Sequence, residues 1–92
     1  PQDYAEAVKW SRLAADQGDV MAQCKLGMMY DNGHGVAQDD AEAYVWFSVA
    51  AAGGDAEAFK LREATARELN DGEIVAASER ATELREKMGS RK

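Results

Sequence analysis

The chain has 92 residues, a formal net charge of −6, one cysteine, and a composition that is 46% hydrophobic. This length allows one domain, and the negative charge argues against a surface that binds nucleic acid or an anionic membrane. The single cysteine excludes an internal disulfide, and no apolar run approaches the ~18–20 residues that span a bilayer.

Helices dominate the predicted secondary structure, because the chain is rich in alanine and has one proline. Apolar residues recur at helical spacing in five segments, and glycines follow most of them. The predicted helices cover residues 4–17, 20–31, 39–52, 56–69 and 73–88.

An aspartate precedes or opens each predicted helix. Its carboxylate can accept a hydrogen bond from the unpaired N–H groups of the first turn, and it complements the positive end of the helix dipole. The expected N-caps are Asp3, Asp19, Asp39, Asp55 and Asp71.

Apolar residues at helical spacing give the predicted helices apolar faces, of which two matter most here. In the first helix Ala7, Trp10 and Ala14 recur at helical spacing, with Leu13 beside them. The last helix has the cleanest apolar face, which consists of Ile74, Ala77, Ala81, Leu84 and Met88.

The sequence repeats at a spacing of 36 residues, which superposes Trp10 on Trp46 and Gly18 on Gly54. A period of this length indicates a solenoid, in which each unit buries its apolar face against its neighbours. Connections are short except at residues 32–38, so consecutive helices should form antiparallel hairpins. The fold expected is all-α, a right-handed α/α superhelix of five antiparallel helices that ends in a C-terminal capping helix.

Residues 22–36 read A-x-x-x-L-G-x-x-Y-x-x-G-x-G-V, and the pattern continues through Asp39, Ala43 and Trp46 to Gly54. This pattern resembles the Sel-one-like repeat, a relative of the tetratricopeptide repeat. The resemblance ends after residue 58, where Arg62 and Glu63 replace the Leu-Gly pair of the motif.

We therefore interpret residues 1–92 as a single Sel-one-like repeat domain and as a C-terminal piece of a longer protein. Residues 3–18 would be the second helix of a preceding repeat, residues 19–54 a complete repeat, and residues 55–92 a degenerate capping repeat. Within the complete repeat, Gly27 is expected to lie opposite the alanine pair of a partner helix, where two backbones approach closely.

The resemblance implies a protein-interaction module, a scaffold or adaptor that presents a concave groove to a protein or peptide of unidentified sequence. A purely structural spacer or dimerisation segment is the alternative. A β-lactamase-like or penicillin-binding activity, described for cysteine-rich relatives, is disfavoured. The chain lacks their cysteine pairs and has no S-x-x-K motif, so we expect no enzyme.

The predicted groove follows the first helix of each repeat, here 20–31 and its equivalent 56–69. Methionines among mixed charges suit an adaptable peptide site. Met28 could instead pack between repeats. The candidate partner-binding residues are Met21, Cys24, Lys25, Met28, Asp31, Asn32, Lys60 and Arg67.

Neither Cys24 nor His34, the only histidine, has a neighbour in sequence that would make it catalytic, and their spacing fits no metal site. We expect no cofactor, no bound metal, no nucleic-acid partner and no membrane insertion. Self-association through the edge around Trp10 and Leu13 is predicted, because that helix would lack its natural cover. For the compartment we expect a bacterial cytoplasm or periplasm.

Overall fold

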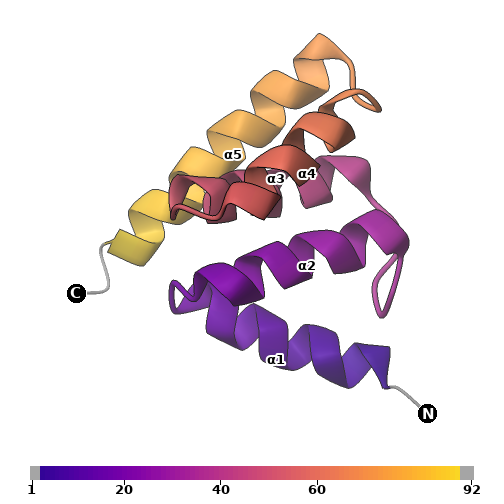
Figure 1. Ribbon diagram of the computed structural model, residues 1–92, viewed down its shortest axis with the longest axis vertical. Coiled ribbons are helices and arrows are strands. Elements are labelled where there is room, and N and C mark those ends of the chain that lie inside the picture. Colours follow the sequence, from indigo (N-terminus) through magenta and orange to yellow (C-terminus); the bar gives the residue numbers. More distant parts are fainter. Residues whose placement is uncertain (1–2, 90–92) are drawn as a thin grey trace.

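The computed structural model describes residues 3–89, which form helices and their connections without any strand. Figure 1 shows the chain reversing direction at each connection, so that successive helices are antiparallel. The predicted all-α class is confirmed. The five helices are α1 (Tyr4–Asp16), α2 (Val20–Asn32), α3 (Asp40–Ala52), α4 (Ala56–Ala66) and α5 (Asp71–Gly89).

Aspartate caps begin the first four helices, as the sequence predicts. In each case the carboxylate accepts a hydrogen bond of 3.0–3.1 Å from the backbone N–H three residues later. This bond satisfies one of the donors that a helix start leaves free. The four capping residues are Asp3, Asp19, Asp39 and Asp55.

The fifth cap differs from the prediction. The side chain of Asn70 accepts a hydrogen bond from the Glu73 N–H at 2.8 Å, and the Glu73 carboxylate accepts one from the Asn70 N–H at 2.9 Å. This reciprocal pair is a capping box. Asp71 is therefore the first residue of α5, and the helix begins two residues earlier than predicted.

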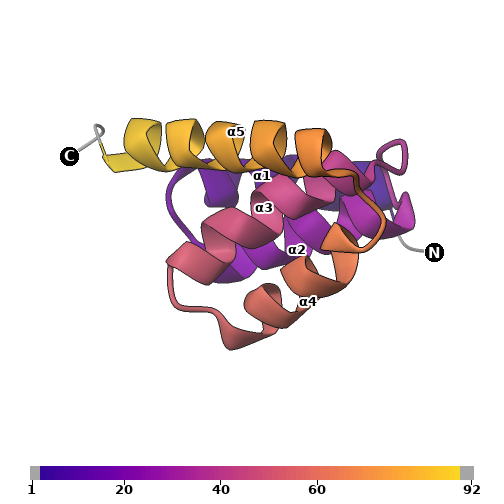
Figure 2. The same ribbon diagram turned by 90° about the horizontal axis from the view of Figure 1, so that it is seen from above.

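Helix α3 is the centre of the fold, because α2, α4 and α5 all pack against it. It is buried on every side, and Trp46 and Phe47 are among its fully covered residues. Figure 2 shows α5 and α4 on opposite sides of α3. The predicted apolar face of α5 is confirmed, since Ala77 and Ala81 are buried and Ile74, Leu84 and Met88 pack against the same core.

Helix α1 packs against α2 with a different face from the apolar one noted in the sequence, and the surface around Trp10 and Leu13 lacks cover, as expected. Its buried residues are Val8, Ser11 and Ala15, whereas Trp10 is 59% exposed and Leu13 is 48% exposed. Of the helices that follow it, only α2 contacts α1 extensively, so the other side of α1 remains open to solvent.

The close approach of α2 and α3 occurs at Gly27, as predicted, but its partner is Phe47 and not an alanine pair. A Cβ atom on Gly27 would lie 2.6 Å from two carbons of the Phe47 ring. The glycine therefore makes room for a large aromatic side chain that is completely buried.

Candidate partner-binding groove

A groove runs between α1 and α2. It consists of two adjoining hollows of about 450 Å³ and about 360 Å³, and Trp10, Ser11 and Lys25 line both. The first hollow extends past Met28 toward the α2–α3 loop, and the second extends toward Met21 at the start of α2. We call these two hollows the α1–α2 groove.

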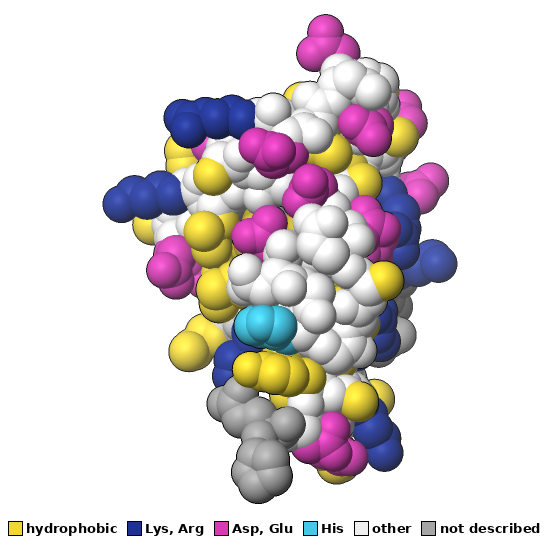
Figure 3. All heavy atoms as spheres, turned by 90° about the vertical axis from the view of Figure 1, so that its right-hand side faces the viewer, with side chains coloured by type: hydrophobic (Ala, Val, Ile, Leu, Met, Phe, Trp, Pro, Cys, Tyr) yellow, Lys and Arg dark blue, Asp and Glu magenta, His cyan; other side chains and the backbone are white. Residues whose placement is uncertain are grey.

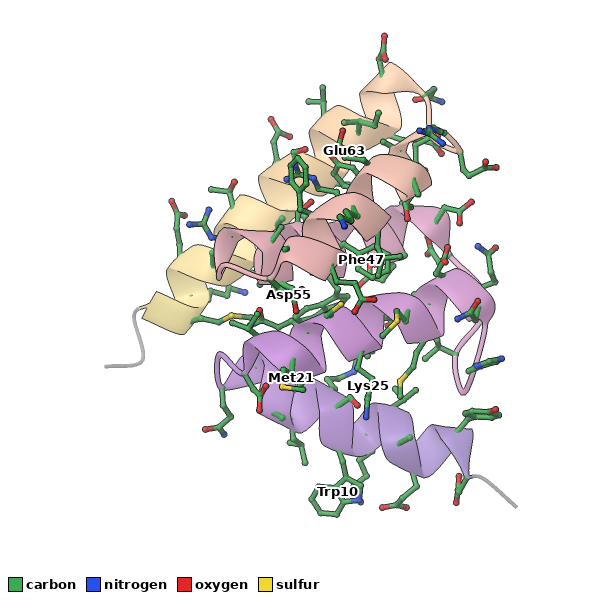
Figure 4. All side chains as sticks on the ribbon, viewed as in Figure 1. Trp10, Met21, Lys25, Phe47, Asp55 and Glu63 are labelled. Carbon is green, nitrogen blue, oxygen red and sulfur yellow. The ribbon has the colours of Figure 1, made fainter. Side chains whose placement is uncertain are left out.

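Trp10 supplies the largest aromatic surface of this groove. Its indole Nε1 donates a hydrogen bond of 2.6 Å to the carboxylate of Glu6, one turn earlier, and the Lys9 ammonium lies 5.5 Å from the ring centroid. Figure 4 shows Trp10 projecting outward from α1. The ring is thus oriented by its own helix, while more than half of the residue stays accessible.

Helix α2 contributes apolar side chains and one charge to the opposite wall. Met21 is 80% exposed, and Met28 is partly buried. Lys25 lies between them in sequence, and Figure 4 shows it extending from α2 toward α1. Four of the six large hydrophobic side chains that are exposed among residues 3–89 belong to these two helices, namely Tyr4, Trp10, Leu13 and Met21.

One end of the groove is closed by the loop that joins α2 to α3. The His34 ring stacks on Tyr4, with ring centroids 4.4 Å apart and an interplanar angle of 21°. At Gly35, where φ is +82°, a Cβ atom would lie 2.4 Å from the Tyr4 carbonyl oxygen, so only glycine allows the loop to approach α1. Figure 3 shows the histidine of this end beside hydrophobic side chains.

The structure brings together half of the residues that the sequence proposed for a groove. The four that line the α1–α2 groove are Met21, Lys25, Met28 and Asn32. The second helix that lines this groove is α1, whereas the predicted groove followed residues 20–31 and 56–69. Trp10, Tyr4 and His34 were not among the proposed binding residues, and the signal that could have found them is the open side of the first helix.

The other four proposed residues lie elsewhere. Three of them are exposed and line none of the hollows described among residues 3–89, namely Asp31, Lys60 and Arg67. Arg67 follows α4 as its C-cap, because α4 ends at Ala66 and not at residue 69.

Cys24, the fourth of these residues, is 4% exposed and packs with Phe47 and Ala58 in the core between α2, α3 and α4. Burial, with a smaller contribution from the carboxylates of Asp55 and Glu57, raises the pKa of its thiol from 9.0 to about 11. The thiol is therefore protonated at neutral pH. Because the thiolate is the nucleophilic form, this cysteine is a packing residue with low reactivity.

Residues 3–89 provide neither a candidate metal site nor a candidate membrane-spanning helix. They contain no cluster of three or more histidine, cysteine, aspartate or glutamate side chains placed to hold a metal ion. None of their helices is both long enough and apolar enough to cross a membrane.

The fold and the groove define a class of protein, an all-helical repeat module with an exposed apolar surface at one end. The sequence model of the Sel1 repeat matches residues 1–19 and 20–55. The chain therefore belongs to the Sel1 repeat family.

Two curated relatives are regulators by name. The chain is 38% identical over 63 residues to chitin synthase regulatory factor 3 of Schizosaccharomyces pombe, an alignment that covers 68% of this chain and 7% of the relative. It is also 38% identical over 55 residues to chitin synthase regulator SKT5 of Malassezia restricta, covering 60% of this chain and 4% of that protein. The chain thus spans less than a tenth of either relative.

These relatives contradict the compartment expected from the sequence. Both are fungal proteins, so they do not support a bacterial cytoplasm or periplasm. Together with the repeat family, they favour a non-catalytic role in protein interaction over an enzymatic one.

Proposed function

We propose that this chain is an adaptor module whose α1–α2 groove receives a segment of a partner protein. The observation that carries the proposal is the exposure of Trp10 in an apolar groove. Tryptophan is enriched among the residues that dominate binding energy at protein interfaces. Membership of the Sel1 repeat family, and the regulatory names of the two relatives, support the same role.

The chemistry of the groove favours one kind of segment. Trp10 and Met21 offer apolar surface on opposite walls, and methionine adapts its shape to different partners. Lys25 lines both hollows, so an acidic side chain of the partner could pair with its ammonium group. The proposed ligand is therefore a segment with an apolar anchor and a neighbouring carboxylate.

Peptide display on the immobilised chain provides the test, because it selects ligands from a large pool of random sequences. The affinity of a selected peptide is then measured for Trp10→Ala and for a control, Val75→Ala. Val75 is also an exposed hydrophobic residue, at 57%, but it lies on α5 outside the groove.

We expect Trp10→Ala to weaken binding at least tenfold, which corresponds to about 1.4 kcal/mol, while Val75→Ala leaves the affinity unchanged. Reversal of charge in Lys25→Glu should lower the affinity and change the selected sequences toward basic residues. Equal losses in Trp10→Ala and Val75→Ala would show that the groove is not the site.

Self-association is a second candidate, favoured by the neighbouring exposure of Trp10 and Leu13 on α1. Under this alternative the open side of α1 would pair with another copy of the chain. Sedimentation of the chain over a range of concentrations distinguishes the two. A dimer that is lost in Leu13→Glu, with peptide binding unchanged, would assign this face to self-association.

A further inference from the structure

A separate hollow, of about 280 Å³, lies between α3, α4 and α5, away from the two hollows of the α1–α2 groove. Two arginines line it, Arg62 from α4 and Arg85 from α5, and no acidic side chain does. Three residues with hydroxyl groups line it as well, namely Ser48, Ser78 and Thr82. On a chain with a net charge of −6, this concentration of positive charge and hydroxyl groups requires an explanation.

Arg62 is held in position by an aromatic neighbour. Its guanidinium carbon lies 4.8 Å from the centroid of the Phe59 ring, and Phe59 lines the same hollow. A stacked guanidinium keeps its planar set of donors oriented for a carboxylate or a phosphate.

The only acid paired with Arg62 among residues 3–89 is Glu63, the next residue in the chain, at 3.2 Å. The Glu63 side chain is 57% exposed, compared with 26% for Arg62. An exposed pair of this kind contributes little to stability. Another anion can therefore replace Glu63 without a large loss.

Ser48 provides an independent observation. It interrupts an otherwise apolar part of α3, and its Oγ is buried without a hydrogen-bond partner among the described residues. A buried hydroxyl that forms no hydrogen bond destabilises the protein, so such groups usually have a partner. Because Ser48 lines the hollow, rotation of its side chain would turn this hydroxyl toward an oxyanion there, which would then accept a hydrogen bond from it.

Two features oppose an anion at this place. Ala51 and Ala52 also line the hollow, and they end α3, where the helix dipole places a partial negative charge equivalent to about half of an elementary charge. The second is the carboxylate of Glu63, which already pairs with Arg62. The two full positive charges of Arg62 and Arg85 still exceed the sum of these negative charges.

We propose that this hollow binds an oxyanion group, either a phosphoryl group or a carboxylate, through Arg62, Arg85 and Ser48. The site would give the module a second contact, separate from the α1–α2 groove, with an acidic or phosphorylated side chain.

The experiment follows backbone and side-chain NMR signals of the chain while inorganic phosphate is added at constant ionic strength, with chloride as the reference salt. A phosphoserine peptide and the same peptide with glutamate are then compared, to separate the phosphoryl group from the carboxylate. The variants are Arg62→Gln, Arg85→Gln and Ser48→Ala. The matched control is Arg67→Gln, an exposed arginine next to α4 that lines no described hollow.

We expect saturable shifts confined to the residues of this hollow, with affinity at least tenfold weaker in Arg62→Gln and Arg85→Gln and unchanged in Arg67→Gln. Ser48→Ala should weaken binding without lowering the melting temperature, since it removes an unpaired hydroxyl. Shifts that do not saturate, or that decrease equally in Arg67→Gln, would overturn the proposal. If Arg62→Gln disturbs the fold through the loss of its contact with Phe59, the phosphate affinity of Arg85→Gln tests the proposal instead.

Discussion

Trp10 and Trp46 occupy the same position of the repeat, 36 residues apart, yet Trp10 is 59% exposed and Trp46 is 2% exposed. Helix α3, which carries Trp46, is covered by α2, α4 and α5, whereas α1 packs extensively against α2 alone. The same residue type is thus a core residue in one repeat and a surface residue in the other. What differs is the number of helices around it.

This difference predicts unequal effects of the same substitution. Trp46→Ala should reduce the free energy of unfolding by about 3–5 kcal/mol, because it leaves a large cavity in the core. Trp10→Ala should cost about 1 kcal/mol or less, as is usual for exposed positions. Urea unfolding of both variants measures this, and similar losses would mean that α1 is covered in solution.

Gly27→Ala should destabilise the chain even though alanine is the better helix former. The added Cβ would overlap the Phe47 ring, and overpacking of this kind costs about 1–3 kcal/mol. Gly72→Ala is the control, because its Cβ would have only an ordinary contact, 3.4 Å from the Asn70 side chain. The double variant Gly27→Ala with Phe47→Leu should regain part of the loss. A Gly27→Ala variant as stable as the original chain would contradict the close contact of α2 and α3.

The capping box at the start of α5 predicts that substitutions of Asn70 and Asp71 will have different effects on stability. Asn70→Ala removes the cap and should cost about 1 kcal/mol. Asp71→Ala removes only a first-turn charge, which is worth about 0.3–1 kcal/mol through the helix dipole. Thermal unfolding of both variants compares them. A larger effect of Asp71→Ala would restore Asp71 as the N-cap.

The raised pKa of Cys24 predicts that the free energy of unfolding decreases at alkaline pH. The pKa of the thiol is raised to about 11 in the folded chain from 9.0, so folding favours the protonated form. This contribution is fully present below pH 9, and it is lost as the pH rises from about 9 toward about 11, where the unfolded chain releases the proton first.

The urea midpoint, followed across this pH range, measures the effect. The control is Cys24→Ala, which lacks the thiol and differs from the original chain in no other ionisable group. The alkaline decrease in stability should be smaller in Cys24→Ala than in the original chain. The same decrease in both would show that the thiol does not contribute.

The sequence alone determined the helices, because their signals are local. An aspartate accepts a hydrogen bond from the N–H group three residues away, and this distance is fixed by the helix itself, as at Asp3 and Asp39. The cap of α5 was misplaced by one residue, because Asn70 and Asp71 are both good N-caps and the geometry of Glu73 decides between them. The 36-residue period likewise indicated a repeat protein, the motif of residues 22–36 identified the family, and the alanine content indicated the all-α class.

Only the tertiary structure decided which sides of those helices meet. The spacing of Ala7, Trp10 and Ala14 is as helical as that of the face that is in fact buried on α1, so periodicity could not choose between them. The partner of Gly27 and the position of the groove beside α1 depend on which helices pack around each residue. Packing is set by side chains distant in the sequence, and the repeat period contains no information about how many neighbours each repeat has.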